Sequence, residues 1–188
     1  MKRRFAAALA LLSTALISTT SAQAEIRKVM DIGDGKLIPR FEMILTLPKD
    51  WVEEKEASKA NGVQMLVPRG KNFHSAPALM YVKISYRREK EQTIEQFVEN
   101  SQKRWRENVA DTKIDKLADV ERTGGRPAYL SYRYENPSRP QQRFEAVSFA
   151  LDTDKDGNDF FVMVALTGKG KKEIDQAIAA YNAFLKAH

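Results

Sequence analysis

Alternating apolar and polar positions predict most of the strands in this chain. A period of two, with apolar residues at every second position, is typical of a strand with one buried face. The segments that show it are 41–47, 78–86 and 127–134. Shorter apolar runs predict further strands over 63–67, 144–151 and 160–167. The last two carry bulky apolar residues on both faces, so we expect both of their faces to be covered.

Two segments instead place apolar residues at the helical period of about 3.6. The first, 94–109, follows Thr93, and Thr93 and Gln96 have the spacing of a capping box. The second is 171–187. The order is strands, helix, strands, helix, and short connections between consecutive strands indicate a largely antiparallel sheet. The predicted fold class is therefore α+β, with helices on both faces of the sheet in an α/β/α sandwich.

The remaining segments predict turns and irregular structure. Residues 25–39 form a mixed lead-in that either pairs as an edge strand or stays loose, and residues 51–61 are charged and irregular. Asn61-Gly62 and Gly124-Gly125 are typical of hairpin turns. No repeat, low-complexity run or linker divides the chain, so we expect one domain over 25–188.

The first 24 residues have the three parts of a secretory signal peptide. The basic residues Lys2, Arg3 and Arg4 precede an apolar run over 5–17, and Ala22-Gln23-Ala24 matches the A-x-A cleavage pattern. The apolar run is short for a membrane span, which needs about 20 residues. We therefore expect cleavage after Ala24 and a periplasmic or secreted protein without a transmembrane anchor. The alternative is an uncleaved anchor.

Charge and cysteine content narrow the function classes. The net charge is +6, and the predicted signal peptide holds three basic residues and no acid, which leaves +3 for residues 25–188. A charge of this size does not argue for nucleic-acid binding. The chain has no cysteine, which excludes disulfides, cysteine-ligated zinc, thiol catalysis and a lipid anchor on cysteine.

Two motifs and the C-terminal helix carry a resemblance to a known family. The motifs are Leu47-Pro48-Lys49-Asp50-Trp51 at a strand exit and Thr123-Gly124-Gly125-Arg126-Pro127-Ala128 before an aromatic strand. With the order of elements, they resemble the PsbP-like superfamily, which includes bacterial periplasmic DcrB-like proteins, over residues 40–186. The resemblance implies an α/β/α sandwich that acts as a binding or assembly accessory, with no common active site. DcrB-like proteins are often lipid-anchored, and this chain departs from them because it lacks the required cysteine.

The segment 152–159 has the pattern that opens a calcium-binding loop, with oxygen ligands at alternate positions and a glycine at the sharp turn. The candidate ligands are Asp152, Asp154, Asp156, Asn158 and Asp159. Met163 stands where the loop needs a bidentate Glu, and the segment joins two strands rather than two helices. The segment is therefore either a weak Ca²⁺ site or, more simply, a polar hairpin tip.

No set of residues indicates catalysis, so we expect a protein that is not an enzyme. His74 lies beside Ser75 in a predicted loop, and His188 lies in an end that we expect to be frayed. Neither histidine has the sequence context of a catalytic triad.

Two further features are candidate binding surfaces. The first is a group of aromatic residues on one predicted strand and at the start of the next. They either line a ligand groove or, more commonly for such residues, form part of the core; they are Tyr129, Tyr132, Tyr134 and Phe144.

The second is a set of basic clusters, which favour anionic envelope lipid over nucleic acid as a partner. Alternatively they form a solvated face, because acidic residues lie among them. The clusters are Arg87, Arg88 and Lys90; Lys103, Arg104 and Arg106; and Lys169, Lys171 and Lys172.

The sequence thus predicts an exported, non-enzymatic binding or accessory protein that engages a protein partner at the envelope. The alternative is a small-molecule or Ca²⁺-binding protein that uses segment 152–159 or a tyrosine-lined groove.

Overall fold

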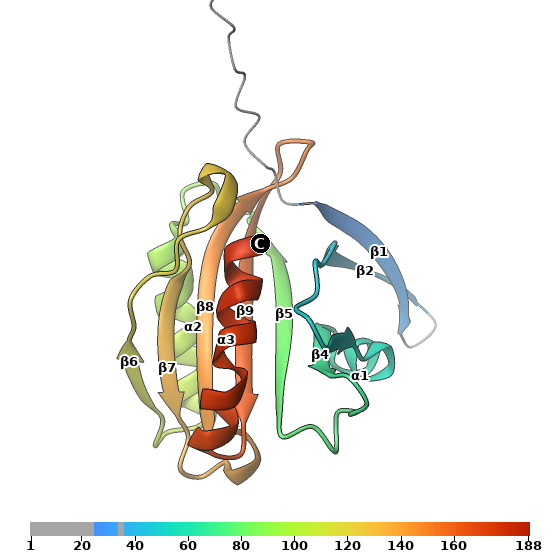
Figure 1. Ribbon diagram of the computed structural model, residues 1–188. Helices are drawn as coiled ribbons and strands as arrows, with labels where there is room; N and C mark the ends of the chain where they lie inside the picture. The colour runs from blue at the N-terminus through green and yellow to red at the C-terminus, as the bar shows by residue number, and fades with distance from the viewer. Residues whose placement is uncertain (1–24, 34–35) are drawn as a thin grey trace, which may run out of the picture.

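The structure is a computed structural model that describes residues 25–33 and 36–188. Its main sheet has seven strands, each antiparallel to its neighbours, in the order β3-β4-β5-β9-β8-β7-β6 (Figure 1). In chain order they are β3 (Trp51–Glu53), β4 (Gln64–Pro68), β5 (Ala78–Tyr86), β6 (Lys113–Lys116), β7 (Leu130–Glu135), β8 (Phe144–Thr153) and β9 (Asp159–Gly168). The described helices are α1 (Lys55–Asn61), α2 (Ile94–Asn108) and α3 (Lys171–Ala187). The predicted α+β class with a largely antiparallel sheet is confirmed.

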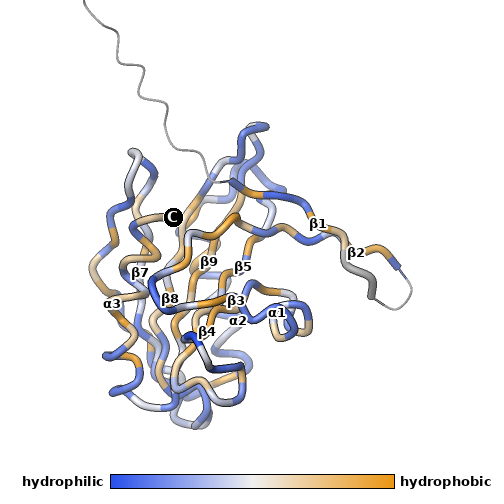
Figure 2. Tube along the Cα trace, turned by 45° about the vertical axis from the view of Figure 1, so that its right-hand side comes forward, coloured by the Kyte–Doolittle hydropathy of each residue, from blue (hydrophilic) through white to orange (hydrophobic). Residues whose placement is uncertain are grey.

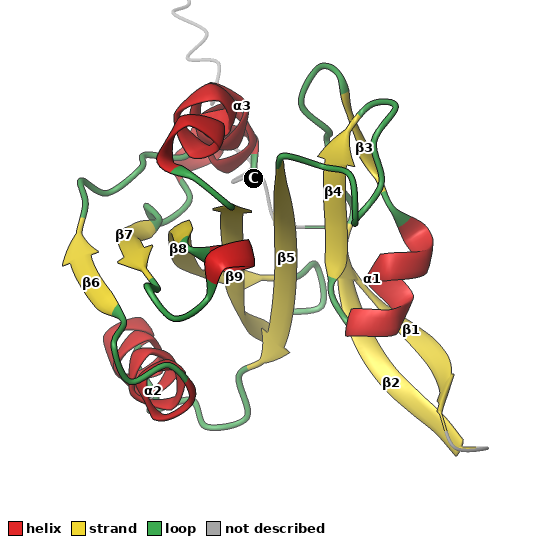
Figure 3. Ribbon diagram, turned by 90° about the horizontal axis from the view of Figure 1, so that it is seen from below, coloured by secondary structure: helices red, strands yellow, loops and turns green. Residues whose placement is uncertain are grey.

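The strands β8 and β9 are almost completely buried because their residues alternate between two hydrophobic clusters. On β8, Ala146 packs in a cluster that includes Phe184 of α3. Its neighbour Val147 packs with Phe149 in a second cluster that includes Val98 of α2. Figure 3 shows β8 and β9 between these two helices. Apolar residues at most positions fit strands that are buried on both faces, and the buried polar exceptions on β8 are Glu145, Ser148 and Asp152.

Both predicted long helices are present. The hydroxyl of Thr93 accepts a hydrogen bond from the backbone N–H of Gln96 at 3.3 Å. The backbone N–H of Thr93 donates to the Gln96 side chain at 2.9 Å, which completes the predicted capping box. The helix α3 spans the segment with the 3.6-residue period, and its buried residues include Tyr181 and Leu185.

One turn prediction and one loop prediction are wrong, and a second predicted turn is less tight than expected. Residues 51–61, expected to be irregular, contain β3 and α1, and the side chain of Glu54 caps the first turn of α1. Gly62 ends that helix at a φ of 63°, so Asn61-Gly62 is a helix C-cap rather than a hairpin turn. Gly124-Gly125 lies in a 3₁₀ turn within a longer connection, and the segments on its two sides pair antiparallel as β6 and β7 and through a bridge between Val120 and Tyr129.

A separate hairpin precedes the main sheet. The strands β1 (Ile26–Gly33) and β2 (Lys36–Met43) form a two-stranded antiparallel sheet that projects from the body (Figures 1 and 2). Residues 26–33 of the predicted lead-in therefore pair with residues 36–43. The strand predicted over 41–47 ends at Met43, because the Gln64 side chain there binds both the N–H and the C=O of Met43 at 2.8 Å.

The predicted signal peptide, residues 1–24, lies outside the described residues. In the part of the chain that is described, no helix has both the length and the apolar character needed to span a membrane.

Candidate functional site

A cleft of about 460 Å³ lies between α2 and the sheet. Its floor is apolar and largely aromatic because α2 approaches the sheet with Phe97 and Trp105, while the strands contribute Tyr134, Phe149 and Met163. The remaining lining residues are Val63, Tyr81, Lys83, Ser85, Ser101, Arg104, Asn108, Glu145 and Val147. The α2 face that was predicted from the helical period thus forms one wall of a cavity as well as part of the core.

Glu145 is the acidic residue of this cleft, and its side chain is almost wholly buried, with 2% of the residue exposed. Its carboxyl accepts hydrogen bonds from the hydroxyl of Tyr81 at 3.3 Å and from the side-chain amide of Asn136 at 3.2 Å. Among the described residues no lysine or arginine forms an ion pair with it. Burial therefore raises the pKa of Glu145 to about 7, although the hydrogen bonds from Asn136 and Tyr81 oppose the rise.

A buried network connects Glu145 to α2. The side-chain oxygen of Asn136 accepts hydrogen bonds from the indole N–H of Trp105 at 3.1 Å and from the hydroxyl of Thr112 at 2.8 Å. Its amide also donates to the backbone carbonyl of Gln142 at 2.9 Å. Because Asn136 is fully buried and uses both ends of its amide, it fixes α2 relative to β8 at the base of the cleft.

The rim of the cleft is positively charged. Lys83 on β5 and Arg104 on α2 are both exposed lining residues. Arg104 makes a hydrogen bond of 3.4 Å to the backbone carbonyl of Asn100, and neither cation forms an ion pair with a described carboxylate. Two cations without acidic partners beside an apolar floor favour an anionic group at the mouth.

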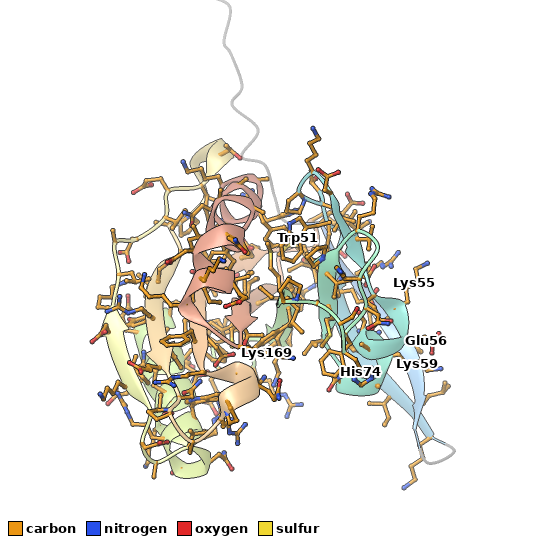
Figure 4. The ribbon with its side chains drawn as sticks, turned by 60° about the horizontal axis from the view of Figure 1, so that its bottom comes forward. Trp51, Lys55, Glu56, Lys59, His74 and Lys169 are labelled. Carbon is orange, nitrogen blue, oxygen red and sulfur yellow. The ribbon has the colours of Figure 1, made fainter. Side chains whose placement is uncertain are left out.

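A second cavity of about 460 Å³ shares Val63 and Tyr81 with the cleft. It lies between the loop after β4, which carries Phe73 and His74, and the end of β9, which carries Lys169. Figure 4 shows His74 and Lys169 in this region, and Lys55 and Lys59 on the outer side of α1. Val63 and Tyr81 therefore contribute to the walls of both cavities.

The aspartate-rich segment is a hairpin tip whose acidic side chains have protein partners. Asp152 is buried and forms an ion pair with Arg122 at 2.7 Å, and Asp159 pairs with Arg87 at 3.1 Å. Asp154 accepts hydrogen bonds from the backbone N–H groups of Asp156 and Asn158, both at 2.9 Å. Burial opposes ionisation of Asp154, but the hydrogen bonds from Asn158 and Asp156 outweigh it and lower the pKa of this carboxyl.

These partners leave the hairpin poorly arranged for a cation. Within residues 25–33 and 36–188, no group of three or more His, Cys, Asp or Glu side chains is placed to hold a metal. Ca²⁺ binding by Asp152, Asp154, Asp156, Asn158 and Asp159 stays a prediction, and it requires Asp152 and Asp159 to leave Arg122 and Arg87.

The four aromatic residues proposed for a groove do not lie together. Tyr129 is buried in the cluster that contains α3, where its ring packs 4.6 Å from the Arg122 guanidinium. Tyr132 and Tyr134 belong to the cluster that contains α2, and of the four only Tyr134 lines the cleft. Phe144 packs instead against the Arg143 guanidinium, 5.3 Å away. Because side chains alternate between the two faces along a strand, Tyr129 and Tyr134 lie on opposite faces of one sheet.

The two histidines have different surroundings. His74 is exposed in the loop after β4, as expected. His188 is buried rather than frayed, because its ring nitrogen accepts a hydrogen bond from the backbone N–H of Thr46 at 2.8 Å and Arg122 donates to its carbonyl. Burial lowers the pKa of His188. Neither histidine contacts a serine and a carboxylate in the manner of a triad.

Two of the three basic clusters lie close together, and some members of the three have acidic partners. Arg87 and Lys171 pair with Asp159 and Asp175, respectively. Arg88, Lys103 and Arg104, from the first two clusters, line one further cavity together with Glu89 and Glu107. Lys169, from the third cluster, lines the second cavity.

Sequence reasoning did not single out Glu145 or Asn136. Each is one polar residue beside apolar or turn-forming neighbours, and no local pattern reports that its side chain points inward. The only signal for Glu145 is a charge within a strand whose flanking residues are apolar on both faces.

Comparison with protein families and with curated proteins finds no match to this chain.

Proposed function

We propose that this protein binds an anionic amphiphile, a small molecule with an acidic group and an apolar body, in the cleft between α2 and the sheet. One observation carries the proposal: an aromatic floor lines the same cleft as Lys83 and Arg104, two cations that form no ion pair with any carboxylate among the described residues. The sequence predicted small-molecule binding as the alternative function of this protein. We now propose this cleft as the binding site, which the sequence did not indicate.

The size and chemistry of the cleft support this class of ligand. Its volume of about 460 Å³ lies within the range of about 300–1,000 Å³ that is usual for small-ligand sites. Phe97, Trp105 and Phe149 supply aromatic surface for the apolar body, and Tyr81 and Ser85 supply hydroxyl groups that orient it.

The charge distribution favours an anion over a cation. The acid in the cleft, Glu145, is buried at the base. Its pKa is about 7, so the carboxyl is mostly protonated and uncharged at lower pH. The cations Lys83 and Arg104 lie at the exposed rim, where the head group of an amphiphile meets water. The head group therefore pairs with the rim while the apolar body enters the cleft.

Calorimetric titration with dodecanoate tests the proposal, with dodecyltrimethylammonium as the probe of opposite charge. We expect dodecanoate to bind and the cation to bind about tenfold more weakly, because two exposed charge pairs together contribute up to about 2 kcal/mol and a factor of ten corresponds to about 1.4 kcal/mol. The double variant Lys83→Gln/Arg104→Gln should remove this preference. The matched control Lys71→Gln/Lys172→Gln, two exposed lysines outside the cleft, should retain it.

A steric variant tests the location. Ser101→Trp, on the α2 wall, should abolish dodecanoate binding while leaving the circular dichroism spectrum unchanged. Equal binding of both probes, or full binding by Ser101→Trp, would contradict the proposal.

We also propose that the protein is exported and is not an enzyme, in line with the signal-peptide pattern of residues 1–24. Mass spectrometry of the protein recovered from a periplasmic fraction tests export. A chain that begins at Glu25 is expected, and one that begins at Met1 would contradict it.

The second candidate function is that of an envelope accessory protein of the PsbP-like kind. We propose that the layers form an α/β/α sandwich, which is supported by the alternation of Ala146 and Val147 between the clusters of α3 and α2. A pull-down from periplasmic extract tests this role, and repeated failure to recover a stoichiometric protein partner would count against it.

A further inference from the structure

The two faces of β5 differ in how completely they are covered. Ala78, Met80 and Val82 are buried in the cluster that contains α3. The residues between them point to the α2 side of the sheet, where Leu79 and Tyr81 are only partly buried. Figure 3 shows α2 beside β7 and β8 rather than over β5. A strand from the middle of the sheet therefore has one partly open face.

This partly open face contributes to both cavities. Leu79 lines the second cavity, and Tyr81 lines both. Lys83 and Ser85, further along the same face, line the cleft. Leu79 and Ser85 are six positions apart, which spans about 20 Å of strand at about 3.3 Å per residue. The two cavities therefore follow one another along a single strand face.

The second cavity continues the apolar character of the cleft. Its volume of about 460 Å³ equals that of the cleft. The apolar residues that line it include Val63, Met65, Phe73, Ala76, Pro77 and Leu79. Phe73 is 39% exposed, so its ring offers apolar surface to a ligand in this cavity. None of the described residues that line the cavity is acidic, and a hydrocarbon chain placed there would leave water without burying a charge.

The charges determine which end of an amphiphile lies in which cavity. Lys83 and Arg104 lie at the rim of the cleft, and neither forms an ion pair with a described carboxylate. Of the described residues that line the second cavity, only Lys169 is a lysine or arginine. The carboxylate of Glu173 lies beside Gly170, the residue that follows Lys169, and offsets its charge. The anionic group is therefore attracted to the cleft rather than to the second cavity.

We propose that the ligand is a long-chain anionic amphiphile whose hydrocarbon chain runs from the cleft along β5, past Tyr81, into the second cavity. Its anionic group pairs with Lys83 and Arg104, as in the proposed function on which this inference rests. The second cavity is thereby assigned to the end of the chain, and chain length becomes a property that the protein selects.

Calorimetric titration with dodecanoate and hexadecanoate, each below the concentration at which it forms micelles, tests this assignment. We expect hexadecanoate to bind the wild type about tenfold more tightly or better, because its longer chain removes more methylene groups from water. Leu79→Trp fills part of the second cavity and should bind hexadecanoate no more tightly than dodecanoate. The matched control Leu117→Trp, outside both cavities, should keep the wild-type difference.

The same titrations separate this inference from the proposed function. If dodecanoate binds the wild type but hexadecanoate binds no more tightly, or if Leu79→Trp keeps the full difference, the second cavity does not hold the chain and only this inference is wrong. If neither acid binds the wild type, the proposed function is wrong and this inference fails with it.

Nitroxide-labelled stearate locates the two ends of the chain in the unsubstituted protein, so this measurement stands even if Leu79→Trp fails to fold. A label near the end of the chain should broaden the amide nuclear magnetic resonance signals of Ala76 and Leu79 most strongly. A label near the carboxylate should instead broaden those of Ser85 and Arg104. The reverse pattern, or broadening at the cleft alone by both labels, would overturn the proposal.

Discussion

At the scale of single residues, the ionisation of the buried Glu145 makes the free energy of unfolding depend on pH. In the folded protein its pKa is about 7, against an ordinary value of 4.5, because burial disfavours the carboxylate. The folded state therefore binds a proton that the unfolded state has lost between these two values. By linkage, the free energy of unfolding falls as pH rises from about 4.5 to about 7.

We expect Glu145→Gln to abolish this fall, because glutamine never ionises. Its oxygen can accept from the Asn136 amide while its own amide donates to the Tyr81 hydroxyl. Near about pH 5 the variant should match the wild type, and above about pH 8 it should be more stable by about 3 kcal/mol. Denaturant unfolding at several pH values measures this. Glu121→Gln, an exposed control, should follow the wild-type curve, and a Glu145→Gln curve parallel to the wild type would contradict the argument.

The buried pair of Arg122 and Asp152 predicts a second residue-scale effect. Both side chains are excluded from solvent, and Arg122 also donates to the backbone carbonyl of Pro127 at 3.2 Å. Arg122→Met should cost about 3–5 kcal/mol, because it leaves Asp152 charged and unpaired in the interior.

A double substitution distinguishes that cost from a loss of packing. Arg122→Met/Asp152→Leu should recover most of the lost stability in a chemical denaturation experiment, because no buried charge remains. If the double variant is as unstable as Arg122→Met, the pair itself stabilises the fold and the expectation fails.

At the scale of elements, a left-handed residue fixes the end of α1. Gly62 has a φ of 63°, and a Cβ there would meet no atom within 4 Å, so backbone conformation alone decides the cost of a side chain. Gly62→Ala should lower stability by about 1 kcal/mol, and Gly62→Asn should lower it less, because asparagine tolerates this region. Thermal unfolding of the two variants measures both effects, and equal stability of Gly62→Ala and wild type would contradict them.

Elements with a long, regular period could be predicted from the sequence, and elements stabilised by tertiary contacts could not. The segment 171–187 repeats its apolar residues over several turns, and α3 spans that segment. The shorter α1 has no such stripe; it depends on the Glu54 cap, and on the Ser58 hydroxyl, which accepts a hydrogen bond from the backbone of Met65 at 2.8 Å. A hydrogen bond between residues brought together by folding leaves no period in the sequence.

The candidate site was beyond sequence reasoning for a related physical reason. A cleft forms where α2 and the sheet fail to close completely, and this depends on the packing of residues as distant as Phe97 and Met163. The polar residues 152–159 attracted attention because they are adjacent in sequence, whereas Glu145 and Asn136 meet through the fold. Sequence patterns report local chemistry, and this site is assembled from the helix α2 and four separate strands, β5, β7, β8 and β9.

At the scale of the whole molecule, the order of the strands makes the sheet depend on its C-terminal part. The last strand in the chain, β9, occupies the middle of the seven, between β5 and β8. Its ten residues pair with β8 along their whole length and with β5 over nine positions. Removal of β9 therefore divides the sheet into two parts that have no common strand.

A chain that ends after Thr153 should consequently fail to fold. It lacks β9 and also α3, so the cluster around Met80 and Ala146 loses its centre. We expect a far-ultraviolet circular dichroism spectrum of an unfolded chain and no cooperative thermal transition. A sharp transition in this truncated protein would contradict the dependence on β9.

The central position of β9 also governs the timing of folding during synthesis. A ribosome makes β3 to β8 before it makes the strand that joins them, so the growing chain has no completed sheet until residues 159–168 emerge. Pairing of β5 with β9 then closes a loop of more than 70 residues, a slow event compared with hairpin formation. If the protein is exported, as we propose, this order has a use, because a translocation channel accepts an unfolded chain and the sheet cannot be completed before the last strand is made.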